Sequence, residues 1–336
     1  MRNILRELCE TNGASGRETA VRDRIIELIR DHCDYRVDAL GNIIAFKKGE
    51  KAPEKRIMVD AHMDEVGFIA TYITESGLIN FATVGGINTE CILSQRVVFE
   101  NGTVGVIGGK PTHLLSAEAK KKLPEVDSLY IDIGARDRAE AERYVSLGDT
   151  AVFCSPYTEQ GDIITARAID DRAGCAALIK LLREDSVYDF YATFSVQEEV
   201  GTRGAATAAF AVAPDFCLCL EATTACDIEG AEGAKNVCFL NCGPIISFMD
   251  RGTLYDRELF NAANASAIPH QIKTAVAGGN NSAAIHKSRD GVRTLAISTP
   301  CRYLHSASCM SSYSDIEGAY ALAKEMISVI GGMSDD

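Results

Sequence analysis

The sequence predicts an α/β fold in which helices flank a mixed sheet and a small β-rich domain is inserted. Strand and helix patterns alternate before residue 66 and again after residue 161, which favours a sheet covered by helices. Between these points the pattern changes to short β runs with few helical repeats. We therefore expect a main domain built from 1–65 and 162–336, and an inserted β-rich domain at 66–161.

The N-terminal residues predict two helices followed by a buried strand. Apolar residues recur at helical spacing in two stretches, Ile4, Leu5 and Leu8, and then Val21, Ile25, Ile26 and Ile29. Between them, Ser15 and Glu18 have the spacing of a capping box, in which Ser15 caps the second helix and Glu18 reaches back to it. The segment RIMVDAH at 56–62 predicts a strand that is buried on both faces.

The inserted region reads as a series of short strands. They are VGFIATYIT, GLINFATV, RVVFENGTVGVIGG and SLYIDIGA. Within the third, the pair Asn101-Gly102 predicts a hairpin with a type I′ turn. The segment SAEAKKKL at 116–123 predicts the one helix of this region, with its lysines on a solvated face.

The alternation of strands and helices resumes in the C-terminal half. The predicted order is helix 172–184, strand 188–196, helix 204–212, strand 215–222, strand 294–300 and a closing helix at 314–330. This order is typical of a sheet sandwiched between helices.

Composition excludes several classes of protein. The 34 basic and 47 acidic residues give a net charge of −13, which argues against nucleic acid as a partner. No apolar run approaches the length of a bilayer span, so we expect no membrane partner. The N-terminus lacks the apolar core of a signal peptide, so we expect a cytoplasmic protein. The 12 cysteines include no Cys-x-x-Cys pair, and we expect them to be reduced.

Imidazole and carboxylate side chains gather beside the predicted strands of the main domain. Ligands of open α/β sheets bind outside the carboxyl ends of the strands, so five segments deliver these groups to one rim. The residues are His62 with Asp64, Asp170 with Asp171, Glu198 with Glu199, Glu221, and His305. Two imidazoles and several carboxylates suit two zinc-like ions with open positions for water. Singly, each has an ordinary structural explanation, such as a solvated acidic turn or a charged helix N-terminus.

The spacing of His62 and Asp64 also predicts that one side chain supports the other. Residues two apart in an extended chain point the same way, so Asp64 can hold the His62 ring from behind. Four other histidines are expected to be structural rather than metal ligands, namely His32, His113, His270 and His286.

The ordered motifs resemble one family, the tetrahedral-type aminopeptidases. These include deblocking and glutamyl aminopeptidases, and they are sometimes labelled cellulases or endoglucanases. The resemblance runs nearly end to end, through NGASGRE, DAHMDEVGF, GVIGGKPTHLL, LYIDIGARDRAEAE, AIDDRAG, QEEVGTRGA and CRYLHS. It implies a fold like that of the dinuclear zinc peptidases, with a PDZ-like or barrel domain inserted.

The resemblance assigns a role to each residue of the rim. Asp170 would bridge two divalent ions, with zinc expected and cobalt or manganese as alternatives. The other ligands would be His62 and Glu221 at one ion, and Glu199 and His305 at the second. Glu198 would be the general base for a bridging water, Asp64 would stand behind His62, and the Asp170–Asp171 bond would be cis. The implied reaction removes N-terminal residues from oligopeptides.

The resemblance also implies an assembly. The inserted domain would shape the substrate pocket and build dimers, and these dimers would assemble into a hollow dodecamer of identical chains.

Three departures from the family pattern leave other functions open. Glu221 stands where close relatives carry aspartate, Asn280–Asn281–Ser282 lie in a segment usually rich in Gly-Thr-Asp-Ala, and SASCMSS follows His305. An altered or inactive peptide-binding homologue is one alternative. A glycoside hydrolase is another, although paired histidines and the absence of tryptophan argue against it.

Overall fold

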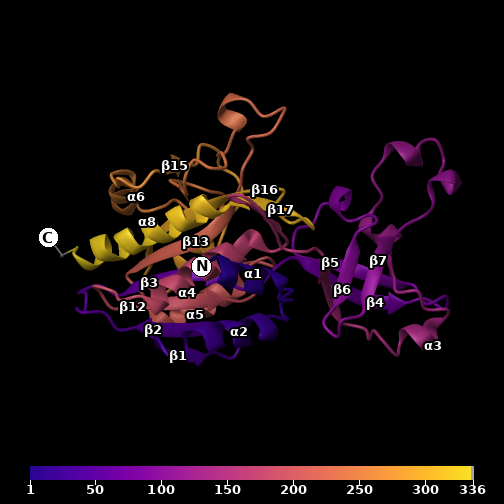
Figure 1. Cartoon of the computed structure of the whole chain (residues 1–336), viewed down its shortest axis with the longest axis horizontal. Coiled ribbons are helices and arrows are strands. Elements are labelled where there is room, and N and C mark those ends of the chain that lie inside the picture. The colour runs from indigo at the N-terminus through magenta and orange to yellow at the C-terminus, as the bar shows by residue number, and fades with distance from the viewer. Residues whose placement is uncertain (334–336) are drawn as a thin grey trace.

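The computed structural model describes residues 1–333 and divides them into a helix-flanked sheet and a barrel (Figure 1). The main domain holds an 11-stranded mixed sheet, and the inserted strands β4, β5, β8, β7, β6 and β9 close into a barrel. The predicted fold class is therefore confirmed, and the inserted domain is a barrel.

The large sheet is mixed, with parallel strands at its centre. Its strand order is β1 (Asp34–Val37), β2 (Ile43–Lys47), β12 (Phe190–Ser195), β3 (Ile57–His62), β13 (Phe216–Thr224), β16 (Arg293–Arg302), β17 (Cys309–Ser312), β11 (Ile163–Ala166) and β10 (Thr158–Gln160), with β14 (Ile245–Ile246) and β15 (Gln271–Ile272) beside β16. β3 runs parallel to β12 and β13, and β13 runs parallel to β16. The carboxyl ends of these four strands therefore meet at one rim.

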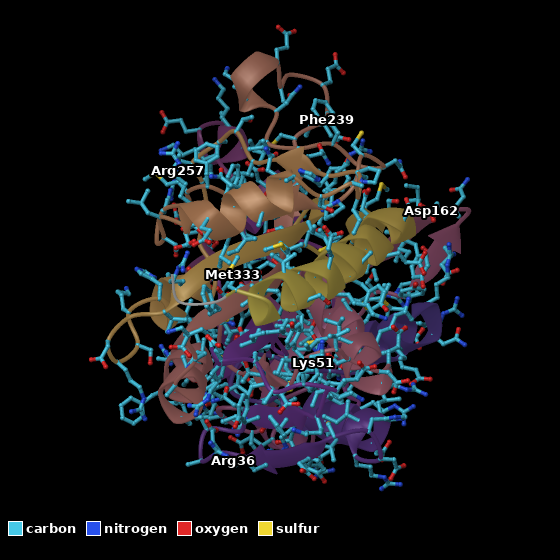
Figure 2. All side chains as sticks on the ribbon, turned by 90° about the vertical axis from the view of Figure 1, so that its left-hand side faces the viewer. Arg36, Lys51, Asp162, Phe239, Arg257 and Met333 are labelled. Atoms are coloured by element: carbon cyan, nitrogen blue, oxygen red, sulfur yellow. The ribbon has the colours of Figure 1, made fainter. Side chains whose placement is uncertain are left out.

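Helices cover both faces of this sheet because alternate residues of each central strand face opposite sides. On β3, Ile57 and Val59 join one apolar cluster, whereas Met58 joins another. The first face carries α1 (Arg2–Glu10), α2 (Thr19–Ile29), α4 (Ile169–Arg183), α6 (Arg257–Asn264) and α8 (Tyr313–Gly331), and the second carries α5 (Arg203–Val212) and α7 (Ser282–Ile285). In Figure 2, α8 crosses the middle of the main domain between Arg36 and Phe239.

The barrel has its own apolar core. It is built from β4 (Gly67–Ile73), β5 (Ile79–Val84), β6 (Arg96–Phe99), β7 (Val104–Gly108), β8 (Tyr130–Asp132) and β9 (Thr150–Phe153), with α3 (Arg138–Ala141) beside them. Phe68 packs edge-on against both Phe81 and Phe153, with ring centroids 5.2 Å apart in each pair. β10 falls within the range 66–161, yet it pairs with β11 in the large sheet.

Three local predictions are wrong. Ser15 does not cap α2, because its hydroxyl donates to Asp64 at 2.6 Å, while Glu18 accepts from the backbone of Gly16 at 2.7 Å. The hairpin between β6 and β7 forms, but its turn is not type I′. Gly102 has a φ of 87°, whereas Asn101 has no positive φ. The loop has three residues, and its turn is closed by the Gly102 N–H, which donates to the Phe99 carbonyl at 2.9 Å, with Gly102 as the left-handed residue.

The third error concerns the lysine-rich segment at 116–123. Only a 3₁₀ turn forms there, η3 (Ala119–Lys121), and its side chains are exposed. Helical stability in proteins comes mainly from packing an apolar face, which this segment lacks. Other 3₁₀ turns are η1 (Thr89–Cys91), η2 (Thr112–Leu114), η4 (Val126–Ser128) and η5 (Gly233–Lys235).

Two expectations from composition have structural counterparts. The 12 cysteines form no disulfide among residues 1–333, and seven of them are buried. Within residues 1–333, none of the helices has both the length and the apolar character needed for a membrane span.

Replacing Phe194 by alanine is expected to lower the free energy of unfolding by about 3–5 kcal/mol. Phe194 lies on β12, is fully buried, and packs in the main apolar cluster, so the change leaves a cavity. Phe239→Ala is the matched control, because the Phe239 side chain is 43% exposed. Urea denaturation of both variants measures the difference, and equal losses would contradict the packing described.

Candidate metal centre

The four parallel strands bring the predicted side chains to one place. His62 is the last residue of β3, Glu221 lies near the end of β13, and Glu198 and Glu199 follow β12. His305 lies in the loop between β16 and β17, and Asp170 begins α4. Five segments far apart in the sequence therefore converge, as the sequence suggested.

Asp170 lies between the two imidazoles. Its Oδ1 is 3.2 Å from His62 Nε2, and its Oδ2 is 3.5 Å from His305 Nε2. Each carboxylate oxygen therefore faces a different histidine, which is the arrangement that a bridging ligand requires. The peptide bond between Asp170 and Asp171 is cis.

Two glutamates complete the two sides of this arrangement. Glu221 Oε2 lies 3.7 Å from His62 Nε2, and Glu199 Oε2 lies 3.2 Å from His305 Nε2. In one group, single ligand atoms of His62, Asp170 and Glu199 lie within 4.8 Å of one another. These distances match the spacing of donors around a cation.

Asp171 is a candidate ligand that the sequence analysis did not assign. Atoms of His62, Asp171 and Glu221 form a second group within 4.8 Å, in which Asp171 takes the place expected for Asp170. We favour Asp170 as the shared residue because its oxygens face both imidazoles, and Asp171 Oδ1 already accepts from Gly174 N at 2.9 Å. The adjacent aspartates in AIDDRAG were the signal for this second carboxylate.

Two buried oxygens fit a bound cation. Glu221 Oε1 and Asp171 Oδ2 are inaccessible to solvent, and neither has a hydrogen-bond partner among residues 1–333. An unpaired buried carboxylate oxygen is costly, whereas a metal ion satisfies it directly. The imidazole and carboxylate donors present therefore suit a zinc-like ion.

Asp64 holds both the imidazole of His62 and the backbone of the two glutamates. Its Oδ1 lies 3.4 Å from His62 Nδ1 and accepts from Glu198 N at 2.9 Å. Its Oδ2 accepts from Glu199 N at 3.1 Å and from the Ser15 hydroxyl at 2.6 Å. Asp64 is fully buried, so these bonds fix the segment after β12 as well as the ring.

The second imidazole is oriented by the barrel. His305 Nδ1 lies 2.8 Å from the carbonyl oxygen of Gly86, in the loop that follows β5. This contact leaves Nε2 facing Asp170 and Glu199.

Burial and crowding of carboxylates dominate the electrostatics. Burial raises the pKa values of Glu199 and Glu221 well above the ordinary range, and neighbouring aspartates add to both shifts. Burial also raises the pKa of Glu198 to about 7. For His305, burial acts to lower the pKa, but the carboxylates of Asp170 and Glu199 outweigh it and raise the pKa to about 10. The centre thus favours positive charge.

A buried ion-pair cluster supports the centre from behind. Arg167 Nη1 lies 2.5 Å from both carboxylate oxygens of Glu65, and Arg172 Nη2 donates to Glu65 Oε1 at 3.2 Å. These two arginines flank the Asp170–Asp171 pair in sequence, and Glu65 follows Asp64. The cluster therefore ties α4 to the end of β3.

The centre opens into a cavity of about 480 Å³. Its lining includes Asp170, Glu198, Glu199, Glu221 and His305, together with Lys273 and Asn280. Among residues 1–333, the Glu198 carboxylate forms neither a hydrogen bond nor an ion pair, whereas Glu199 Oε2 lies at ion-pair distance, 3.2 Å, from His305 Nε2. The Glu198 carboxylate is therefore available to a molecule bound in the cavity.

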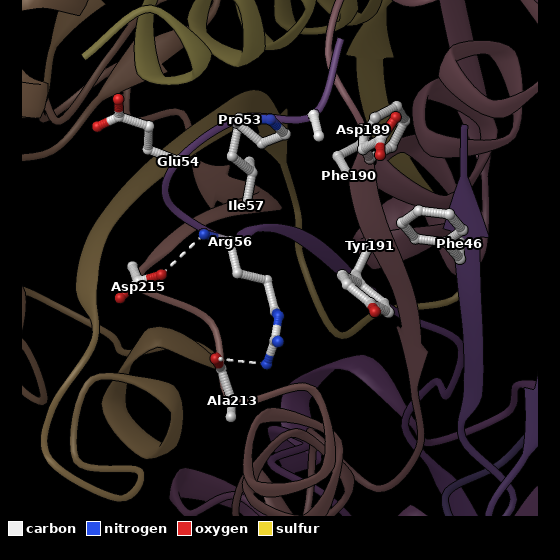
Figure 3. A pocket seen from close by; sticks show the side chains of 11 residues that line it. Phe46, Pro53, Glu54, Arg56, Ile57, Asp189, Phe190, Tyr191, Ala213 and Asp215 are labelled. Atoms are coloured by element: carbon white, nitrogen blue, oxygen red, sulfur yellow. Dashed lines mark hydrogen bonds between the residues drawn. The ribbon is translucent and has the colours of Figure 1, made fainter. Parts of the chain in front are cut away.

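A second hollow, of about 390 Å³, lies at the opposite ends of the strands (Figure 3). It is lined by Ile57 and Phe190, which begin β3 and β12, and by Arg56 and Asp215. The backbone N–H of Arg56 donates to Asp215 at 2.7 Å, and its guanidinium donates to the Val212 carbonyl at 2.6 Å. Arg56 and Asp215 are thus paired within the fold, and the hollow contains none of the predicted site residues.

The departures at 280–282 have structural explanations. Asn281 Nδ2 donates to the buried carboxylate of Asp60 at 2.7 Å, where a carboxylate would repel it. Asn280 donates to the Tyr255 hydroxyl at 2.9 Å and accepts from Ser282 N at 2.8 Å. These amides hold the loop against the sheet.

Comparison with known proteins identifies the family. The family model described as M42 glutamyl aminopeptidase matches residues 41–322. The chain belongs to this family. M42 peptidases are metal-dependent aminopeptidases, which agrees with the donor groups above and makes the chain a hydrolase of the aminopeptidase class.

Relatives of the M42 chain share its full length. A putative aminopeptidase of Acetivibrio thermocellus is 39% identical over 97% of this chain and 98% of its own. The lysyl aminopeptidase of Pyrococcus furiosus is 32% identical over 96% of each chain. The solved TET1 peptidase of Pyrococcus horikoshii, which can assemble into a tetrahedron or a large octahedral shell, is 34% identical, covers 96% of this chain and 98% of its own, and has a TM-score of 0.84.

Adding Zn²⁺ or Co²⁺ to chelator-treated protein is expected to raise its melting temperature, because cation binding offsets the crowding of buried carboxylates. When the free ion concentration is about 100 times the dissociation constant, binding raises the free energy of unfolding by ~2.7 kcal/mol. Differential scanning fluorimetry measures the shift. His62→Ala should abolish most of it, whereas His113→Ala, at an exposed position on the barrel, should not. A shift of equal size in both variants would show that these ions bind elsewhere.

Proposed function

We propose that the chain is a two-metal aminopeptidase that removes N-terminal residues from oligopeptides. The observation that carries this proposal is the position of Asp170, whose two oxygens face His62 and His305 separately. With Glu221 beside His62 and Glu199 beside His305, each imidazole has its own carboxylate partner. This pairing supports two ligand sets joined by one bridge.

Zinc is the ion that the donor set favours, with cobalt and manganese as alternatives. Two divalent ions held by these residues would polarise the scissile carbonyl and lower the pKa of a water molecule between them. Proton transfer and the positioning of the reacting groups are left to side chains of the protein.

Glu198 is the proposed general base. Its carboxylate lines the cavity, accepts no hydrogen bond among residues 1–333, and belongs to the same segment as the ligand Glu199. It would take a proton from the attacking water and deliver it to the leaving amine. The bond from its backbone N–H to Asp64 would hold it in place, so Asp64 is a positioning residue for both the base and His62.

The excess of carboxylates also supports exopeptidase action. A free α-ammonium group carries positive charge and would be attracted to the Glu198, Glu199 and Glu221 end of the cavity. Family membership leaves the preferred side chain open, because the family description names glutamyl substrates and the relative from P. furiosus is named for lysyl substrates.

We also propose that identical chains assemble through the barrel, first as dimers and then as a dodecamer. Apolar side chains are exposed on the inserted domain, including Tyr72 at 48%, Leu114 at 57% and Leu123 at 54%. Such exposed apolar side chains supply contact surface for a second chain. The assembly of the related TET1 peptidase supports the same behaviour here.

Glu198→Gln is expected to lower kcat by about 10²–10⁴-fold, because the amide cannot accept the proton of the water. Steady-state kinetics on aminoacyl-4-nitroanilides measures the loss, and metal analysis should show unchanged metal content. Glu229→Gln, at an exposed position, is the matched control.

Full activity of Glu198→Gln would reject the proposed base. Failure of the metal-loaded wild-type chain to cleave any free-amine peptide would instead favour a peptide-binding homologue.

Light scattering is expected to give a particle mass that is a multiple of the 36.2 kDa chain mass. Replacing Leu114 and Leu123 by serine should reduce the particle size, because it removes apolar contact surface. Leu254→Ser is the control, since Leu254 is 75% exposed but lies on the main domain. A monomeric wild-type chain would rule out the assembly.

A further inference from the structure

Four consecutive backbone N–H groups after β12, those of residues 196–199, donate to side chains from three distant segments of the chain. The acceptors are Asn42 Oδ1 for the first, Glu18 Oε1 for the second, and the two carboxylate oxygens of Asp64 for the last two. All three side chains are buried. Because buried backbone donors need partners, these side chains determine the path of the segment that carries the proposed base.

Gln197 has the unusual backbone conformation of this segment. Its φ is 58°, in the left-handed region that residues other than glycine seldom adopt, because Cβ crowds the backbone there. Such a conformation persists where the surrounding structure enforces it. Gln197 directly precedes Glu198, so its backbone angles set the position from which the Glu198 side chain extends.

Hydrogen bonds hold the peptide planes on both sides of Gln197. Its own N–H donates to Glu18 at 3.1 Å, and the next N–H, that of Glu198, donates to Asp64 at 2.9 Å. The first of these planes is also held by Gly204, whose N–H donates to the carbonyl oxygen of residue 196 at 3.0 Å. Loss of the Glu18 carboxylate is therefore expected to tilt this plane rather than release it.

Glu18 is itself held firmly, although it lies 179 positions from Gln197 in the sequence. Its Oε1 also accepts from the N–H of Gly16 at 2.7 Å, so the acceptor is fixed by its own turn. That turn is joined to the end of β3, because the Ser15 N–H donates to the Glu65 carbonyl at 3.2 Å. Glu18 is only 6% exposed, and a carboxylate in such a place costs free energy unless N–H groups satisfy it.

We propose that Glu18 is a positioning residue for the proposed general base, because it holds Gln197 in its left-handed conformation and so sets where the Glu198 carboxylate lies. That carboxylate forms neither a hydrogen bond nor an ion pair among residues 1–333, so its position depends on the backbone that carries it. This inference rests on the proposed aminopeptidase function and adds a residue to the part of it that transfers the proton.

Glu18→Ala is expected to lower kcat on aminoacyl-4-nitroanilides by about 10- to 100-fold, because a shift of about 1 Å in a reacting group lowers a rate by up to about 100-fold. KM should change little, because the interaction lost acts on the transition state. Glu18→Gln should keep most of the wild-type kcat, since its amide oxygen can still accept both N–H groups. Glu10→Ala, at an exposed position at the end of α1, is the matched control.

A double variant separates positioning from a general loss of structure. If Glu18 acts through Glu198, Glu18→Ala should cause no further loss of kcat in a chain that already carries Glu198→Gln. Melting temperature and metal content are measured for each variant. Glu18→Asp keeps the charge but is one methylene shorter, and it gives the same comparison if the alanine variant does not fold.

Hydrogen exchange supplies a readout that does not depend on activity. The peptide that contains residues 196–199 is expected to exchange faster in Glu18→Ala than in Glu10→Ala, because one of its N–H groups has lost its acceptor. Equal exchange in the two variants would count against the contact between Glu18 and Gln197.

The kinetic outcomes are distinguishable. Wild-type kcat in Glu18→Ala, or equal losses with and without Glu198→Gln, would overturn the role of Glu18 and leave the aminopeptidase intact. Full activity of Glu198→Gln alone would reject the base, and the role of Glu18 with it. Cleavage of no anilide by the metal-loaded wild-type chain would overturn the aminopeptidase itself.

Discussion

The crowding of buried carboxylates at the carboxyl ends of parallel strands is the constraint on which the rest of this structure depends. Asp170, Glu199 and Glu221 are each buried or nearly so, and they lie within reach of the same two imidazoles. Like charges in such a place are unstable unless positive charge lies between or beside them. The surrounding groups hold these carboxylates in place. Asp64 accepts from the backbone N–H groups of Glu198 and Glu199. The ion pairs of Glu65 with Arg167 and Arg172 tie α4 to the sheet.

The same constraint separates the roles of two adjacent residues. Glu199 faces His305, whereas the carboxylate of Glu198 is left to the cavity. A strand that ends in two glutamates therefore supplies one group to the centre and one to whatever the cavity holds. Elsewhere in the lining, Asp250 accepts three hydrogen bonds from its own loop, whereas the only acceptor for Lys273 Nζ among residues 1–333 is the Ala277 carbonyl.

The sequence predicted the sheet, the barrel and the set of converging residues, because strand and helix periodicity are strong and parallel strands share a rim. It did not predict details that depend on tertiary contacts. Ser15 has the spacing of a helix cap, but the buried Asp64 is a better acceptor than a helix end for its hydroxyl. Asp171 was not assigned as a ligand because its nearness to Glu221 follows from the turn into α4 rather than from any spacing.

The carbonyl oxygen of Gly86 belongs to the barrel, yet it contacts the ring of a residue in the main domain at 2.8 Å. Deleting the inserted segment would therefore remove the contact that orients the His305 imidazole. Any hinge motion between the two bodies would swing one imidazole, and any rigid clamp on the barrel would steady it. The inserted domain thus fixes the orientation of one of the two imidazoles of the centre, that of His305.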